Sequence, residues 1–393
     1  MTNVYLVSGV RTAVGDFGGA LKDIAAVELA TKVSIEALRR SGASPELIQT
    51  VVFGQVVHTD TKDPYLPRVA AVNAGVPFGA PAMQVNRLCG SGLQAIISAS
   101  QSILLGDVDM ALAGGVESMS RMPYYVYSNR FGSKMGDSVM ADSLLGGLTD
   151  PFDKIHMGVT AENVARRYEI SREKQDDTAH ESHRRASVAT REGRFTDQIL
   201  PIEVKQGRKT TMFTVDEHIR HDAKREDFDG LRAVFQKENG TVTAGNSSGL
   251  NDAAAAVVLA SEEAVRKHDL KPLARLVSYA HAGVEPAYMG IGPVPATRAA
   301  LARAGLSIAD LGVVESNEAF ASQACAVISE LGLDPAIVNV NGSGISIGHP
   351  IGATGCMNTV KLAYEMHRGG HRYGLVTMCI GGGQGIAAIF ERV

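Results

Sequence analysis

The sequence has no tryptophan, few aromatic residues and only four cysteines among its 393 residues. The cysteines Cys89, Cys325, Cys356 and Cys379 show no CxxC spacing, which disfavours a structural zinc site and a disulfide scaffold. Cysteine use of this kind is typical of a reducing compartment, so we expect a cytoplasmic protein. The first residues also lack the basic start and the long apolar core of a secretory signal.

Long apolar runs and a charge excess are missing as well. The longest plain apolar run lies near residues 253–260, far short of the roughly 20 residues that a membrane span needs. The formal net charge is −4, which gives no electrostatic basis for binding nucleic acid or an anionic membrane, and we expect neither partner. Apolar residues make up 45% and charged residues 20%, as in a globular protein, and the length suits two or three units.

Glycine is the residue in excess. The 42 glycines are about half again the usual share of about 7%. They cluster in short strings, which favours tight turns and a close approach of the backbone to a ligand.

Two pairs of similar stretches indicate an internal duplication. The segments that begin at Glu36 and Ala299 each show an amphipathic helix that ends at a glycine, Gly42 or Gly305, followed by a "VV" strand. The segments that begin at residues 83 and 336 each show strand, "VN", a turn rich in glycine and serine, helix, strand and glycines. The apolar strands in them do not alternate, which is typical of sheets that are covered on both faces.

The duplication divides the chain into three parts. We expect one half at residues 1–118 with 250–270, and the other at residues 271–393. Residues 119–249 are charged and loop-rich, with one long polar helix after the capping residue Ser171, and are interpreted as an insertion laid over the core. The alternative is a third autonomous domain.

Two residues of different reactivity lie at matching turns of the two halves. Cys89, in "VNRLCGSGLQAI", precedes a helical pattern and is either a small hydrophobe at a turn or a nucleophile whose pKa the helix N-terminus lowers. His349, in "GISIGHPIGATG", lies in the corresponding region of the second half, and Pro350 is expected to start the next helix. It is either a buried histidine that closes a turn or a base for Cys89.

Two further positions carry open alternatives. Cys379 precedes "GGGQG" and is either a core cysteine or a thiol beside exposed backbone N–H groups, which is how an oxyanion hole is built. Asn317 follows a strand and is either a helix N-cap or an amide that holds a water or an oxyanion. Cys325 and Cys356 lie in apolar helical patterns and are expected to be packing residues.

The histidines do not predict a metal site. His180 and His183, like His218 and His221, are three residues apart in polar stretches. No cysteine or carboxylate cluster completes either pair, so we expect solvated side chains and no metal.

Four segments taken together resemble the signature segments of the thiolases, the acetyl-CoA acyltransferases. They are "VNRLCGSGLQAI", "NEAFASQACAV", "GISIGHPIGATG" and "CIGGGQGIAAIFE", and the likeness continues through "KIHMGVTAENVA" and "TVTAGNSSGLNDAAAA". The resemblance covers essentially the whole chain. It implies an α/β protein with the thiolase fold, in which duplicated βαβαβαββ halves form a layered αβαβα core with an inserted loop domain.

The resemblance also implies roles for individual residues. Cys89 would be the acylated nucleophile, and His349 would take its proton and later help to bind the thioester oxygen. Cys379 would move the proton at the α-carbon, Asn317 would position a water in one oxyanion hole, and the N–H groups of Cys89 and Gly381 would form the other. The residues that match coenzyme A contacts or the walls of the substrate tunnel are His156, Met157, Arg220, Phe235, Ala244, Ser248, Met289, Ala319 and Phe320. Coenzyme A and acyl-CoA would be substrates, with no permanently bound cofactor, and the assembly would be a homotetramer.

One loop departs from the commoner thiolase pattern. Where many members read "GGAIAxGHP", this chain reads "GSGISIGHP", with Ser343, Gly344 and Ser346. We expect these changes to alter the acyl pocket, since the loop resembles that of bacterial β-ketothiolases that accept longer 3-ketoacyl chains. Two alternative functions fit the sequence less well. A condensing ketoacyl synthase has no second catalytic cysteine, whereas this chain has Cys379. A non-catalytic acyl-CoA or lipid carrier would be expected to have lost at least one of the three reactive residues, and none is lost here.

Overall fold

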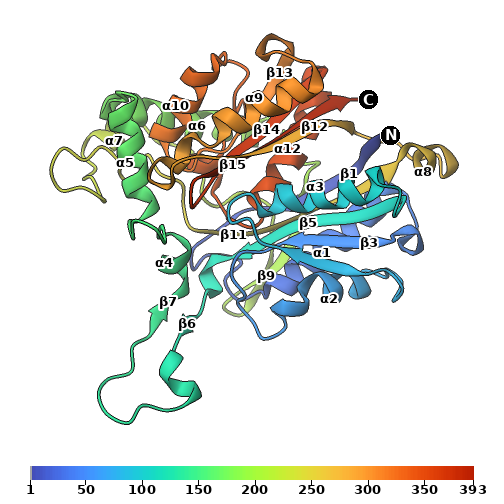
Figure 1. The fold of residues 1–393 in the computed structure, drawn as a ribbon, viewed down its shortest axis with the longest axis horizontal. Helices are drawn as coiled ribbons and strands as arrows, with labels where there is room; N and C mark the ends of the chain where they lie inside the picture. The colour runs from blue at the N-terminus through green and yellow to red at the C-terminus, as the bar shows by residue number, and fades with distance from the viewer. Residues whose placement is uncertain (1) are drawn as a thin grey trace.

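Eleven strands form one mixed sheet that runs through both halves of the chain (Figure 1). The computed structural model describes residues 2–393. The strands of the N-terminal half are β1 (Val4–Thr12), β2 (Gly15–Asp16), β3 (Thr50–Gly54), β4 (Ala82–Val85), β5 (Met110–Ser118) and β11 (Asn251–Ser261), and the segment between the halves adds β8 (Ile199–Leu200). Those of the C-terminal half are β12 (Ala274–Gly283), β13 (Leu311–Ser316), β14 (Tyr373–Ile380) and β15 (Gln384–Arg392).

The two halves repeat the same pairing pattern. In the first, β1 pairs with β11, β11 with β5, and β5 with the parallel strand β3, which has β4 on its other side. In the second, β12 pairs with β15, β15 with β14, and β14 with the parallel strand β13. A parallel bridge between Val314 and Val338 stands where the first half has β4. The predicted duplication is therefore visible in the topology, while the boundaries at residues 118, 250 and 271 stay a prediction.

Helices cover both faces of each half of the sheet. Helices α1 (Ala26–Ser41) and α2 (Leu66–Asn73) lie on the outer face of the first half, and α9 (Pro293–Ala304) and α10 (Ala321–Leu331) on that of the second (Figure 1). Between the halves lie α3 (Ser91–Leu104) and α12 (Thr354–Gly369). The five layers follow the αβαβα order that the resemblance implied. The predicted glycine ends of α1 and α9 are also confirmed, because Gly42 and Gly305 adopt the left-handed conformation.

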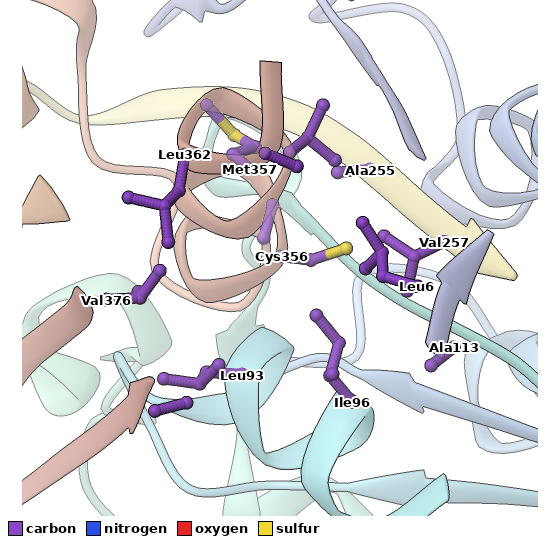
Figure 2. Packing of buried hydrophobic residues seen from close by; sticks show 14 of the residues in the cluster. Leu6, Leu93, Ile96, Ala113, Ala255, Val257, Cys356, Met357, Leu362 and Val376 are labelled. Carbon is purple, nitrogen blue, oxygen red and sulfur yellow. The ribbon is translucent and has the colours of Figure 1, made fainter. Parts of the chain in front are cut away.

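The middle layer is the core of the molecule. Figure 2 shows Cys356 of α12 on the side of that helix toward Leu93 and Ile96 of α3, with strand residues of both halves around them. The two helices touch through backbone. A Cβ atom at Gly355 would lie 2.3 Å from the backbone nitrogen of Leu93. This close contact brings the starts of α3 and α12 together, and with them the regions of Cys89 and His349.

Residues 119–249 lie over both halves rather than apart from them. Their elements are β6 (Tyr124–Tyr125), β7 (Ala141–Asp142), α4 (Ser143–Gly147), α5 (Met157–Arg167), α6 (Arg172–Arg191), β9 (Ile202–Gln206), β10 (Lys209–Phe213) and α7 (Glu226–Asp229). The predicted cap of α6 is present, since the Ser171 hydroxyl accepts the Lys174 N–H at 3.1 Å. Helices α5 and α6 pack on α10, and α6 also packs on α11 (Gly344–Ile347), whereas β8 extends the sheet beside β1.

The same segment carries a projecting arm. Strands β6 and β7 pair at its base, and the chain between them extends away from the body of the molecule (Figure 1). From α8 (Glu262–Lys267) the chain passes into the second half. Within residues 2–393, no helix is both long enough and apolar enough to cross a membrane.

Candidate active site

One cavity of about 470 Å³ is lined by residues of both halves and of the 119–249 segment. Every predicted site residue except Asn317 lies in its wall. These residues are Cys89, His156, Met157, Arg220, Phe235, Ala244, Ser248, Met289, Ala319, Phe320, His349, Cys379 and Gly381. Loops far apart in the sequence thus meet around one space.

Cys89 sits in a tight turn just before α3. Helix α3 begins at Ser91, and Leu88 has a φ of +45°, a conformation that side-chain-bearing residues rarely adopt. The turn is held by Ser91, whose hydroxyl donates to the Leu88 carbonyl at 2.6 Å and accepts the Arg87 N–H at 2.9 Å. Strain of this kind is often found at functional residues.

The resting Cys89 thiol is not activated by the helix. Burial raises the pKa of Cys89 to about 11, and the backbone N–H groups of Gly381 and of Cys89 itself only partly oppose that rise. The prediction that the helix N-terminus lowers this pKa is therefore wrong, because removal of the thiolate from water outweighs the nearby donors. A thiol with this pKa is protonated near pH 7.

The side chain of His349 lines the same cavity, and its tautomer is set by its neighbours. Its Nδ1 lies 2.7 Å from the Thr354 hydroxyl oxygen, and that hydroxyl donates to the Pro350 carbonyl at 2.9 Å. The hydroxyl oxygen must then accept from His349 Nδ1, which leaves Nε2 as the unprotonated nitrogen. Burial lowers the pKa of His349 to about 4, so the imidazole is neutral near pH 7.

Asn317 does not cap a helix. It follows β13, and α10 begins only at Ala321, with Phe320 at the N-cap position. The Asn317 amide nitrogen lies 3.4 Å and 3.5 Å from the two ring nitrogens of His349, so it rests against the ring, and its Oδ1 is buried without a hydrogen-bond partner. The N-cap interpretation is wrong.

Pro350 does not start the next helix either. Helix α12 begins at Thr354, and the Pro350 carbonyl accepts the N–H groups of Ala353 and Thr354 in a preceding turn. The extra turn is what lets Thr354 reach back to the histidine ring.

Cys379 is a fully buried thiol in the cavity wall. It lies near the end of β14, and burial, with the neighbouring Cys89, raises its pKa above the usual range. The glycines that follow make the turn into β15, where Gly382 and Gly383 have φ of +76° and +80°. Cys379 precedes this turn, and Gly381 within the turn presents its backbone N–H to Cys89. The turn therefore links Cys379 along the chain to a group that faces the other thiol. Cys325 and Cys356 lie in α10 and α12, buried as expected.

The rest of the cavity is mostly apolar and lies under the 119–249 segment. His156 caps α5 by accepting the Gly158 N–H at 3.0 Å, and its ring stacks on Phe235 with centroids 4.7 Å apart. Phe235 in turn meets Phe320 edge to face at 6.3 Å. Such a channel suits a long, flexible ligand with few charges along its length. Arg220 is exposed at the end of this wall.

The expectation of solvated histidines is wrong for His183. Its ring is buried, it accepts the Arg220 N–H through Nδ1 at 3.2 Å, and burial with nearby cationic groups lowers its pKa to about 3. His218 lines the cavity and pairs with Asp16. Across residues 2–393, no group of three or more histidine, cysteine or carboxylate side chains is arranged to hold a metal ion.

The altered loop does not touch the cavity. None of Ser343, Gly344 and Ser346 lines it. Ser346 faces α6 instead, where its hydroxyl lies 2.8 Å from that of Ser182. These residues therefore do not contact the acyl pocket directly, and the expectation that they alter it stays a prediction. Residues that sequence reasoning missed include Leu88, Met119, Leu148, His218 and Ile351, which line the cavity, and Thr354, which orients His349.

Fold and site together define an enzyme with a duplicated α/β core and with two cysteines and a histidine at one cavity. Two domain profiles match the chain, "Thiolase, N-terminal domain" over residues 4–263 and "Thiolase, C-terminal domain" over residues 270–392. The chain belongs to the thiolase family, and its activity is that of a thiolase.

Relatives over the full length agree with this assignment. The chain is 63% identical over 391 residues to the β-ketothiolase BktB of Cupriavidus necator, with 99% of each chain covered. It is 47% identical over 393 residues to the acetyl-CoA acetyltransferase of Paracoccus denitrificans, with 100% of each covered. The structure of human mitochondrial 3-ketoacyl-CoA thiolase in complex with CoA is similar with a TM-score of 0.97 at 45% identity, covering 100% of this chain and 98% of that one.

Proposed function

We propose that Cys89 carries the acyl group in the reversible transfer between coenzyme A and acetyl-CoA, which cleaves a 3-ketoacyl-CoA or forms one by Claisen condensation. One observation carries this proposal: Cys89, the neutral His349 and Cys379 line the same cavity. A nucleophile, a base and a second proton carrier are the groups that the two half-reactions need.

In the cleavage direction, His349 Nε2 takes the Cys89 proton and the thiolate attacks the 3-keto carbon. The negative oxygen that forms is stabilised by the N–H groups of Cys89 and Gly381, each such donor contributing about 3 kcal/mol. The bond between C2 and C3 breaks, Cys89 keeps the acyl group, and the leaving acetyl-CoA enolate takes a proton from Cys379. The raised pKa of Cys379 supports this role, because burial keeps the thiol protonated until the enolate forms.

In the second half-reaction, the thiol of a free coenzyme A gives its proton to the Cys379 thiolate, which restores the Cys379 thiol, and attacks the acyl-Cys89 carbonyl. The proton that His349 took returns to the Cys89 sulfur as the new acyl-CoA leaves. An acyl thioester on Cys89 has about the same transfer potential as acyl-CoA, so the cycle runs in both directions. A serine ester would lose that potential. Asn317 is proposed to hold a water that stabilises the thioester oxygen, which its unpartnered Oδ1 supports.

The apolar wall is proposed to hold the pantetheine arm of coenzyme A. Ser248, Ala244, His156 and Met289 line it, and Arg220 at the exposed end is proposed to meet the nucleotide. We further propose a homotetramer in the cytoplasm. The four free thiols support a reducing compartment, and the exposed apolar side chains of the arm support assembly.

Substrate range is tested by rates for two substrates side by side. The similarity to a β-ketothiolase supports acceptance of chains longer than acetoacetyl. One further methylene in an apolar pocket contributes about 0.8 kcal/mol, so we expect kcat/KM for 3-ketovaleryl-CoA to lie within about tenfold of that for acetoacetyl-CoA. A preference for acetoacetyl-CoA of a hundredfold or more would contradict the proposed range, and failure to cleave either substrate would overturn the function.

A further inference from the structure

The loop that carries His349 belongs to the second half of the chain but is held by side chains of the first half. We call residues 348–352 the histidine loop. Asn251 begins β11, and its buried Oδ1 accepts the His349 backbone N–H at 2.9 Å. The Asn251 amide nitrogen donates to the Gly15 carbonyl and to Asp16, each at 3.2 Å. Hydrogen bonds therefore hold both the oxygen and the nitrogen of the Asn251 amide.

Glu117 holds the other end of the same loop. It lies near the end of β5, and its fully buried carboxyl group, whose pKa burial raises to about 8, accepts the Gly352 N–H at 2.9 Å. The same carboxyl group accepts the N–H groups of Val56 at 3.0 Å and Val57 at 3.2 Å, just beyond β3. Strands β5 and β11 are neighbours, and the pairing of Glu117 with Ala253 places Glu117 and Asn251 at the same end of the sheet.

The two glycines at the ends of the histidine loop pack directly against the side chains of Asn251 and Glu117. A Cβ atom at Gly348 would lie 2.5 Å from Asn251 Cγ, and one at Gly352 would lie 2.5 Å from Glu117 Oε2. Gly348 also has a φ of +111°. Between these two points, Ile351 packs in an apolar cluster against which Cys89 also packs. A shift of the loop would therefore move His349 relative to the nucleophile.

Neither Glu117 nor Asn251 lines the cavity, so neither touches the substrate. We infer that Glu117 and Asn251 are positioning residues that clamp the histidine loop from both ends and so fix the distance of His349 from Cys89. The inference rests on the proposed role of His349 as the base for Cys89. Proton transfer and attack depend steeply on geometry, and a misplacement of about 1 Å costs on the order of a hundredfold in rate.

The test measures the rate constant for acetylation of Cys89 at saturating acetyl-CoA, by rapid quench and mass spectrometry. The rate constant is normalised to the fraction of Cys89 that is acetylated at long times. Asn251→Ala is expected to lower it by about a hundredfold. Glu117→Gln keeps the shape, but an amide offers one acceptor oxygen for three N–H groups, and we expect about a tenfold loss. The KM for acetyl-CoA should stay within about twofold in both variants, because the cavity wall is unchanged.

Glu162→Gln is the matched control. Glu162 is also a buried carboxylate that accepts backbone N–H groups, those of Thr241 and Val242, but it lies away from the histidine loop. It should lower the thermal midpoint as Glu117→Gln does while leaving the normalised rate constant within about twofold of wild type. A residue with a merely structural role reduces the acetylatable fraction and not the rate constant of the molecules that remain folded.

The double variant tests whether the two contacts act through one loop. Because both residues hold the same segment, Asn251→Ala with Glu117→Gln should lose much less than the thousandfold product of the single effects. If Asn251→Ala does not fold, Glu117→Gln against Glu162→Gln decides the matter. Unchanged normalised rate constants in the variants that fold would overturn the clamp. If wild-type Cys89 is not acetylated at all, the proposed function itself fails, which is a different result.

Discussion

At the scale of single residues, two thiols of one cavity differ in their proposed roles. Cys89 lies in a strained turn, where the backbone N–H groups of Gly381 and of Cys89 itself face its sulfur. Cys379, in contrast, is fully buried near the end of a strand. Both thiols are protonated at rest, because burial raises the pKa of each. Reactivity therefore depends on which of them has a neutral base within reach.

Cys379→Ser should separate the two half-reactions. Acetylation of Cys89 by acetyl-CoA should survive at least in part, because Cys89 and His349 are intact. Condensation should fall by roughly 10²–10⁴-fold, the loss expected when a positioned acid or base is removed. Rapid-quench acetylation and steady-state condensation, measured on the same preparation, check this. An equal fall in both steps would place Cys379 in the first half-reaction or in folding.

The sequence predicts which residues meet at the cavity better than it predicts the environment of those residues. Cys89, His349 and Cys379 stand in short motifs whose glycines mark turns, so their types and positions were visible. The pKa of Cys89 was not, because burial depends on what the rest of the chain lays over the thiol. Asn251 and Glu117 lie about a hundred residues or more from the histidine loop, and no local pattern links them to it.

At the scale of elements, the site depends on the contact between α3 and α12. Glycines allow their backbones to touch, since a Cβ atom at Gly92 would lie 2.7 Å from the Cys356 backbone nitrogen. Local patterns predicted both helices, the polar helix α6 and the glycine ends. They misplaced the starts of α10 and α12, because Asn317 rests against the ring of His349 and Pro350 stands in a separate turn before α12.

Gly355→Ala should destabilise the protein by about 2 kcal/mol or more. The added methyl group would meet the backbone of Leu93 at 2.3 Å, and a backbone neighbour cannot rotate away. The free energy of unfolding in urea measures the effect. Gly79→Ala is the control, since that glycine is exposed with nothing within 4 Å, and it should change stability by less than about 0.5 kcal/mol. Equal stability of the two variants would contradict a backbone contact between α3 and α12.

At the scale of the whole molecule, duplication explains why the site lies where it does. Each half contributes one turn and one helix to the middle layer, and the two turns carry Cys89 and His349. The 119–249 segment then covers the opening with an apolar wall. Its arm contributes nothing to the cavity and instead exposes large apolar side chains, including Tyr127, Phe131 and Met135.

The exposed apolar side chains of the arm predict that copies of the chain assemble through it, and that substitutions in the arm weaken the assembly. Exposed apolar side chains on a projecting element favour contact with another copy. We expect wild type to have the mass of four chains by light scattering. The triple substitution Tyr127→Ser, Phe131→Ser and Met135→Ser should reduce that mass while the thermal midpoint and the acetylation of Cys89 stay close to those of wild type. A mass that is unchanged in the triple variant would show that the arm does not hold the assembly together.

The central claim is that Cys89 carries the acyl group. The most direct measurement is to incubate the protein with acetyl-CoA, quench, digest and locate the acetyl group by mass spectrometry. We predict a single acetyl group on the peptide that contains Cys89. It should be absent in Cys89→Ser, together with the exchange of acetyl groups between coenzyme A molecules, and it should form slowly in His349→Ala. An acetyl group on Cys379 in its place, or normal exchange by Cys89→Ser, would contradict the account.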